Sequence, residues 1–117
     1  MLTIQKKVTD IDENYDSGAL ALFDGNLGIE GGTIQIDLTG IAGTADGVIK
    51  VYVSNDIDAV KGWALMVTEN ITATPFQMIT NIYLPYKYIK YTITLNSITN
   101  IDTLELWGSF IQEQKGV

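Results

Sequence analysis

The 117-residue sequence contains no cysteine, no histidine and no arginine. Without cysteine it has no disulfide framework, no thiolate nucleophile and no Cys-ligated zinc or iron–sulfur site. Without histidine it has no imidazole base for a serine triad and no imidazole metal ligand. We therefore expect no catalytic residues and predict that the protein is not an enzyme.

Positive charge is also scarce, because seven lysines face 14 acidic residues and the net charge is −7. An acidic surface without arginine repels phosphate backbones, so we expect no nucleic-acid partner. No apolar run reaches the ~18 residues of a membrane span, and Met1–Asp12 has no signal-peptide core. These absences predict a chain without a membrane span that is made in a cytoplasm.

Residues with β-branched side chains are abundant, with 16 Ile, 13 Thr and 7 Val. They favour strands over helices. Apolar and polar residues alternate in most of the segments that we expect to be strands, which are Gly18–Phe23, Thr33–Thr39, Val48–Ser54, Trp63–Thr68, Met78–Leu84, Tyr86–Asn96 and Thr103–Phe110. Turn-rich segments, including Gly40–Gly47 and Glu69–Pro75, are predicted loops. The pattern predicts an all-β protein, a single antiparallel β-sandwich of jelly-roll type with about 7–8 strands.

The alternation also predicts which side chains point into the core. The inward set is Ile34, Ile36 and Leu38; Ile49, Val51 and Val53; Trp63, Leu65 and Val67; Ile89, Tyr91, Ile93 and Leu95; and Leu104, Leu106 and Phe110. Residues 1–17 are polar and are predicted to be an extended N-terminal arm or a loosely held first strand. Residues 18–117 are predicted to form the β-sandwich domain.

Several short motifs follow one another in a characteristic order: Asp24-Gly25-Asn26, Ile34–Leu38 (IQIDL), Val51–Asp56 (VYVSND), Trp63, Tyr88–Tyr91 (YIKY) and Leu104–Gly108 (LELWG). This order resembles discoidin-type domains of the galactose-binding-like jelly-roll superfamily. The resemblance implies a jelly roll, but Leu27–Gly32 replaces the family's Thr-x-Trp, and Lys90 stands where the family prefers Arg. The family's ligand residues therefore do not carry over. Small acidic versions without cysteine are similar to modules of bacteriophage virions.

Four aromatic residues alternate out of phase with the inward sets: Tyr52, Tyr86, Tyr88 and Trp107. If the late strands are neighbours, these side chains form an exposed aromatic patch. Such a patch is an interface anchor, a platform for stacking on a glycan, or a surface covered by the N-terminal segment. All three interpretations remain open at this point.

The spacing of Asp10, Asp12, Asn14 and Asp16 places oxygen ligands at alternate positions, as in a calcium loop. The EF-hand pattern fails, because Tyr15 occupies the sixth position instead of Gly and Ala21 the twelfth instead of Glu. A solvated acidic segment is the alternative to a structural calcium site. We expect no other cofactor.

Two functions fit these observations. The first, implied by the resemblance, is a non-enzymatic structural protein of a bacteriophage virion: a decoration, penton, spike or fibre-base module. It would act through protein–protein contacts with itself, as a homo-oligomer, and with other virion proteins. Its location would be the virion, assembled in the host bacterial cytoplasm. The alternative is a discoidin-like carbohydrate-binding module for adhesion to surface glycans, with Trp107 and one or more tyrosines stacking on the sugar.

Overall fold

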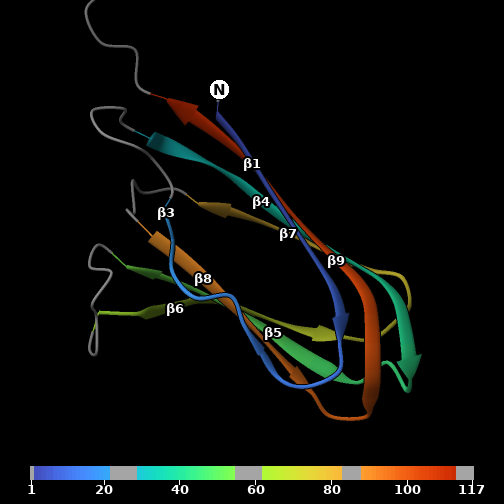
Figure 1. The fold of residues 1–117 in the computed structure, drawn as a ribbon. Coiled ribbons are helices and arrows are strands. Elements are labelled where there is room, and N and C mark those ends of the chain that lie inside the picture. Colours follow the sequence, from blue (N-terminus) through green and yellow to red (C-terminus); the bar gives the residue numbers. More distant parts are fainter. Residues whose placement is uncertain (1, 22–28, 55–61, 83–87, 113–117) are drawn as a thin grey trace, which may run out of the picture.

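The computed structural model describes the backbone of residues 2–21, 29–54, 62–82 and 88–112, and the side chains of 6–20, 33–54, 62–80 and 88–107. Strands make up most of this chain, and they form two facing antiparallel sheets (Figure 1). The prediction of an all-β antiparallel sandwich of jelly-roll type is confirmed. Within the described ranges, no helix is long and apolar enough to cross a membrane.

Sheet A has the strand order β1-β9-β4-β7 and sheet B the order β2-β8-β5-β6. A further short strand, β3, also pairs with β8, so β2 and β3 share one edge of sheet B. Sheet A contains β1 (Leu2–Ile11), β4 (Ile29–Gly43), β7 (Phe76–Ile82) and β9 (Ile98–Gln112). Sheet B contains β2 (Tyr15–Asp16), β3 (Leu20–Ala21), β5 (Gly47–Ser54), β6 (Ala64–Ile71) and β8 (Tyr88–Leu95).

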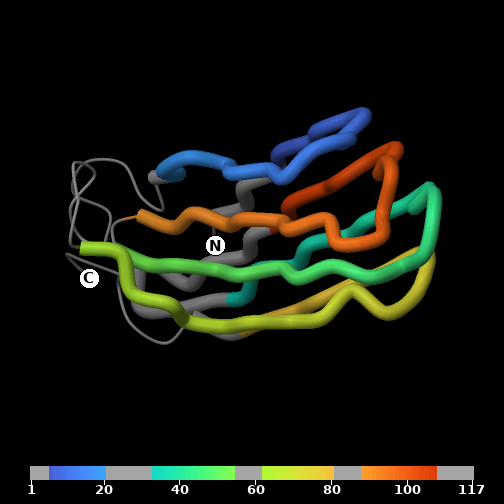
Figure 2. Tube along the Cα trace, turned by 90° about the horizontal axis from the view of Figure 1, so that it is seen from below, coloured from blue at the N-terminus to red at the C-terminus, as the bar shows by residue number. Residues whose placement is uncertain are grey.

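The chain crosses between the sheets at one end of the sandwich. The connections β4–β5, β6–β7 and β8–β9 turn back together at that end (Figure 2). Asp46 holds two of these turns together, because its carbonyl oxygen accepts the backbone N–H groups of Asn96 and Ser97 at 3.0 and 3.1 Å. The sheets are thus joined at this end by short, hydrogen-bonded turns.

The core lies between the two inner faces and consists mainly of β-branched and leucine side chains. The central strands follow the predicted alternation: the buried residues include Ile34, Ile36, Leu38, Ile49, Val51, Val53, Ile89, Tyr91, Ile93, Leu104 and Leu106. Because alternate residues of a strand point to opposite faces, most of the outward positions of these strands carry polar or aromatic residues. Phe110 lies outside the described side chains.

β1 is an edge strand of sheet A and pairs with β9 along most of its length. It covers much of the segment that the sequence predicts to be an arm or a first strand. Lys6 lies opposite Leu106, which is buried. Because directly opposed residues share a face, Lys6 occupies an inward position of the strand.

Near the turn end, three neighbouring strands change the face that they present. Thr9, Thr103 and Thr39 form one row, and two residues further along Ile11, Ile101 and Ile41 form another, which is buried. Strict alternation would keep both rows on the outer face. Asp10 (φ 55°) and Gly40 (φ 67°) lie between the rows, and their left-handed backbone turns the isoleucines inward to close the sandwich.

Two predicted loops are partly strands. Residues 40–43 of the predicted loop Gly40–Gly47 belong to β4, and β6 extends to Ile71 within the predicted loop Glu69–Pro75. In both cases the pairing of a long neighbouring strand outweighs the local turn composition. A Cβ at Gly43 would lie 2.6 Å from the carbonyl oxygen of Ser97, which explains why glycine stands there inside a strand.

The inward set predicted for Trp63–Thr68 is wrong at two positions, Trp63 and Leu65. Val67 lies opposite Val51, but the next pair along is Leu65 with Tyr52, so Met66 is an extra residue. This β-bulge moves Leu65 to the outer face, where its side chain is 53% exposed. Trp63 is only half-buried and lies near Lys90 on that same outer face rather than in the core.

Candidate functional site

The outward aromatic residues lie on both sheets and do not form one patch. Tyr52 on β5 and Tyr88 on β8 are outer-face positions of sheet B, whereas Trp107 on β9 lies on the outer face of sheet A. Tyr86 lies outside the described residues. The two outer faces therefore carry separate aromatic groups.

Trp107 is the central aromatic residue of the outer face of sheet A. It lies opposite Gln5 on β1 and Gln35 on β4, and Gln35 in turn lies opposite Ile79 on β7. Trp107 is 38% exposed and Ile79 is 60% exposed. This row thus presents an indole ring to solvent with a glutamine on the neighbouring strand.

The next row of the same face carries charged and amide side chains. It runs Lys7, Glu105, Asp37 and Gln77 across β1, β9, β4 and β7. Gln35 Nε2 donates to both carboxylate oxygens of Asp37, at 3.1 and 3.0 Å, and Gln77 Nε2 donates to Asp37 Oδ1 at 3.0 Å. Asp37 therefore holds two glutamine side chains in place, and one of them, Gln35, lies directly opposite Trp107.

The rows lie two residues apart along each strand, which corresponds to about 6.7 Å. The third row adds hydroxyl groups, with Thr39 hydrogen-bonded to Thr103 through their side chains. The outer face of sheet A thus offers one apolar platform followed by carboxylate, amide and hydroxyl groups. This combination suits a ligand that has an apolar face and polar edges.

The outer face of sheet B differs because a lysine covers its aromatic rings. Lys90 Nζ lies 5.3 Å from the ring centroid of Tyr52 and 4.9 Å from that of Trp63. Both distances allow cation–π attraction. A ligand that stacked on either ring at that position would have to displace the ammonium group. Leu65, which lies opposite Tyr52, adds an exposed apolar side chain to this face.

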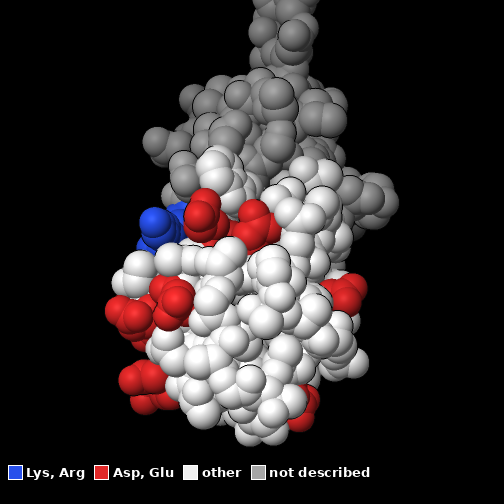
Figure 3. Space-filling view, turned by 90° about the vertical axis from the view of Figure 1, so that its right-hand side faces the viewer, with Lys and Arg blue, Asp and Glu red and all other residues white. Residues whose placement is uncertain are grey.

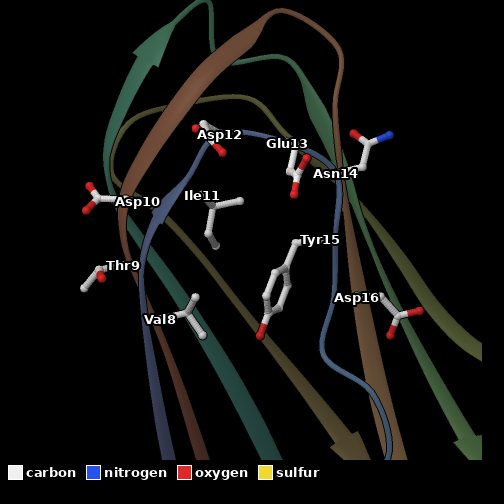
Figure 4. Close-up of a pocket in the computed structure, with 9 residues that line it drawn as sticks. All are labelled: Val8, Thr9, Asp10, Ile11, Asp12, Glu13, Asn14, Tyr15 and Asp16. Atoms are coloured by element: carbon white, nitrogen blue, oxygen red, sulfur yellow. The ribbon is translucent and has the colours of Figure 1, made fainter.

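The predicted calcium ligands line a pocket of about 400 Å³ formed by residues 8–16 (Figure 4). The side chains of Asp10 and Asp16 point to opposite sides of the segment in this view. Asn14 Oδ1 accepts the backbone N–H of Leu95 at 2.9 Å, and Asp16 Oδ1 accepts that of Gly18 at 2.8 Å. Among the described residues, no group of three or more acidic side chains is arranged to hold a metal ion. Calcium binding stays a prediction.

Acidic side chains are dispersed over the side of the molecule that Figure 3 shows, and lysine appears only near one margin. The negative net charge is thus spread over this side rather than gathered in one deep site.

Tyr91 is a fully buried polar residue at the centre of sheet B. Its hydroxyl group has no hydrogen-bond partner among the described residues, and its ring centroid lies 5.9 Å from that of Tyr15. Burial raises the pKa of the Tyr91 hydroxyl well above its ordinary value of 10.0, and the neighbouring Tyr15 acts in the same direction. Tyr91 therefore stays protonated and neutral in the folded protein.

No protein-family model and no curated protein matches the chain. Similar folds occur among solved structures. A subunit of Bacillus endospore appendages, described as disulfide-linked pili, is 16% identical with a TM-score of 0.41, and the match covers 93% of this chain and 88% of that one. The K1 cleaved adhesin domain of Lys-gingipain from Porphyromonas gingivalis W83 is 19% identical with a TM-score of 0.48, covering 88% and 63%. A family 4 carbohydrate-binding module is 12% identical with a TM-score of 0.44, covering 93% and 70%.

These proteins are described as binding or structural modules rather than enzymes. At such low identity the similarity concerns the fold alone, the jelly-roll β-sandwich. The virion role stays a prediction.

Sequence reasoning did not identify Gln35, Asp37 and Gln77 as neighbours of Trp107. Alternation alone places Gln35 and Asp37 outward. Their position beside Trp107 depends on the pairing of β4 with β9, which are far apart in the sequence.

Proposed function

We propose that this chain is a carbohydrate-binding module and that the outer face of sheet A binds a neutral glycan. The observation that carries the proposal is the exposed Trp107 beside the hydrogen-bonded group of Gln35, Asp37 and Gln77. A pyranose ring has an apolar face that stacks on an aromatic ring, and its hydroxyl groups lie at the ring edge. The spacing of about 6.7 Å between rows matches a ligand of that size.

Each side chain has a distinct role in this proposal. Trp107 supplies the stacking surface, which excludes water from the apolar face of the sugar. The side-chain oxygens of Gln35 and Gln77 accept hydrogen bonds from sugar hydroxyls, because their Nε2 groups already donate to Asp37. Asp37 thus acts as a positioning residue for two amide groups.

The composition of the face favours a glycan over a protein partner. The central part of a protein–protein interface is apolar and depleted of charged residues. Here the row next to Trp107 carries carboxylate and amide groups and the row beyond it carries threonine hydroxyls, while the exposed Ile79 lies two strands away from Trp107. A neutral sugar is favoured over an anionic one, because Asp37 and Glu105 lie one row away from Trp107 and the chain has a net charge of −7.

Binding to a panel of soluble neutral polysaccharides, measured by titration calorimetry and affinity electrophoresis, tests the proposal. We expect saturable binding of at least one polysaccharide that weakens at least about tenfold in Trp107→Ala, which corresponds to about 1.4 kcal/mol. Gln35→Ala should weaken the same binding, because it removes one acceptor and releases Asp37. Circular dichroism establishes that each variant is folded.

The matched control is Tyr52→Ala, which removes an outer-face aromatic from the opposite sheet. This variant should bind as the unchanged protein does. Failure of all polysaccharides in the panel to bind would contradict the proposal. A loss caused by Tyr52→Ala with no effect of Trp107→Ala would place the sugar on sheet B instead.

A second candidate is a structural protein that acts through protein contacts, including the predicted virion role as a decoration, penton, spike or fibre-base module. The observation that favours it is the exposed Leu65 beside Tyr52, Trp63 and Lys90 on sheet B, a group that suits the anchor of a protein partner. Light scattering, with and without calcium, measures whether the purified chain forms a discrete oligomer. A monomer under both conditions would remove self-assembly from this candidate.

A further inference from the structure

The sandwich has four sheet edges, and three of them carry features that discourage pairing with another strand. On β1 the inward position opposite Leu106 is occupied by Lys6. On β6 the position opposite the buried Ile49 is occupied by Glu69, and the bulge at Met66 interrupts the strand. An inward-pointing charge or a bulge at an edge prevents a second sheet from adding there. The remaining edge of sheet B consists of two-residue strands.

The fourth edge, β7, has none of these features. Its sequence is FQMITNI, which contains no charged residue, no glycine and no proline. It pairs with β4 in an uninterrupted register from Gly32–Ile82 to Leu38–Phe76, and β7 is the last strand of sheet A on that side. Its middle residue, Ile79, is the most exposed large apolar side chain among the described residues, at 60%.

We propose that β7 is a homodimerisation edge, at which it pairs antiparallel with β7 of a second copy about a twofold axis. Sheet A then continues across the dimer in the order β1-β9-β4-β7-β7-β4-β9-β1. The backbone N–H and C=O groups on the free side of β7 would form hydrogen bonds with the same groups of the partner.

A second copy of the chain is the partner that best fits the charge of this edge. A twofold axis places only the residues close to it near their own counterparts, so a charged side chain at the centre of the strand would face a like charge. Pairing β1 with itself about its centre would place Lys6 of each copy opposite Lys7 of the other, and pairing β6 with itself would bring the Glu69 carboxylates of both copies into one short ladder. Among the described edge strands longer than two residues, β7 is the one without a charged residue, in a protein whose net charge is −7.

The dimer has a consequence that rests on the proposed glycan-binding function. Antiparallel strands in one sheet point equivalent residues to the same face, so both Trp107 rings would lie on one surface. They would be five strand spacings apart, or about 24 Å. A polymeric glycan that reached both rings would bind with higher apparent affinity than a short oligosaccharide, without any new contact.

Analytical ultracentrifugation of the unchanged protein over a range of concentrations tests the dimer without any glycan, so its result does not depend on the proposed function. We expect the mass to rise from 12.8 kDa towards twice that value. Ile79→Lys places two ammonium groups near the twofold axis and should raise the dimer dissociation constant at least about tenfold. The matched control is Leu65→Lys, the same kind of change at an exposed residue of sheet B, which should leave the dissociation constant unchanged.

Hydrogen–deuterium exchange of the unchanged protein supplies a second test that needs no variant. Amides of β7 should exchange more slowly as the concentration rises, while those of β1 and β6 should not change. A monomer at millimolar concentration would overturn the proposal. So would a dimer that Leu65→Lys dissociates and Ile79→Lys does not, or one whose formation protects β1 or β6 instead of β7.

Discussion

Gly40 lies at the bend in sheet A, where a single added methyl group should be costly. Its φ of +67° is a left-handed conformation, which costs a residue with a side chain about 1–2 kcal/mol. A Cβ at Gly40 would also lie 2.6 Å from the Cβ of Asp102. Rotation of the Asp102 side chain does not move its Cβ, so the neighbouring backbone must shift, which adds about 1–3 kcal/mol. We expect Gly40→Ala to lower the free energy of unfolding by about 3 kcal/mol.

Gly18→Ala is the matched control for this substitution. Gly18 has nearly the same φ, +69°, but no atom lies within 4 Å of its Cβ position. This variant should lose only the backbone contribution of about 1–2 kcal/mol. Urea unfolding followed by tryptophan fluorescence measures both losses. Equal losses in the two variants would refute the role of Asp102, as would failure of Asp102→Gly to reduce the cost of Gly40→Ala.

Three further predictions follow from burial and charge. Tyr91→Phe removes a buried hydroxyl without a described partner and should leave stability at pH 7 unchanged or raised by about 1 kcal/mol. Because the pKa of Tyr91 in the folded state lies above 10.0, this residue ionises first in the unfolded chain, and the unchanged protein loses stability above pH 10. Urea unfolding at alkaline pH should show that Tyr91→Phe lacks this part of the loss. Leu38→Ala, at a fully buried position, should lower the free energy of unfolding in urea by about 2–5 kcal/mol. Leu65→Ala should lower it by less than about 1 kcal/mol, because the bulge at Met66 moves Leu65 to the outer face. Similar losses in the two variants would contradict the bulge. Lys90→Gln removes the ammonium group above two rings and should lower the free energy of unfolding by about 0.5–1 kcal/mol. Lys90→Arg keeps a cation above the rings and should lose only a small part of this stabilisation. Identical losses in the two variants would argue against a cation–π contribution.

The central part of the fold could be predicted from the sequence because its strands alternate without interruption. Thr33–Thr39 and Val48–Ser54 place every second side chain in the core, as the buried Ile36 and Val51 show. Where the pattern is regular, the period of two determines both the strand and its inner face. The all-β sandwich follows from a series of such strands.

Prediction failed where a single residue changes the face of a strand. The extra residue at Met66 exposes Leu65, and because residues 64–67 are all apolar, the sequence of β6 does not indicate which of them points outward. The left-handed backbone at Asp10 and Gly40 has the opposite effect, because it buries isoleucines that strict alternation would expose. In both cases the pairing with a neighbouring strand decides the outcome, and the local sequence does not contain that information.

The N-terminal strand was hard to assign for a different reason. An edge strand that resists pairing carries a charge at an inward position, and Lys6 has that place in β1. The same residue breaks the alternation by which a strand is identified, so the segment resembles a polar arm. The charge that protects the edge of β1 is thus also the residue that makes this strand hard to identify from the sequence. The other edge strand of sheet A, β7, has no charged residue, and the sequence predicts a strand over Met78–Leu84 where the structure has Phe76–Ile82.

Outward position alone does not show which aromatic residue is available to a ligand, because the strand register decides its neighbours. Tyr52 and Trp107 both alternate out of phase with the core, and the sequence does not distinguish them. The structure gives Tyr52 a lysine above its ring and gives Trp107 a row of amide and carboxylate groups. The ammonium group already contacts the exposed side of the Tyr52 ring. The exposed Trp107 ring, beside fixed polar groups, offers a sugar both a stacking surface and hydrogen-bond partners. The neighbours of an aromatic residue across the sheet therefore determine whether it can bind a ligand, and those neighbours come from strands that only the fold brings together.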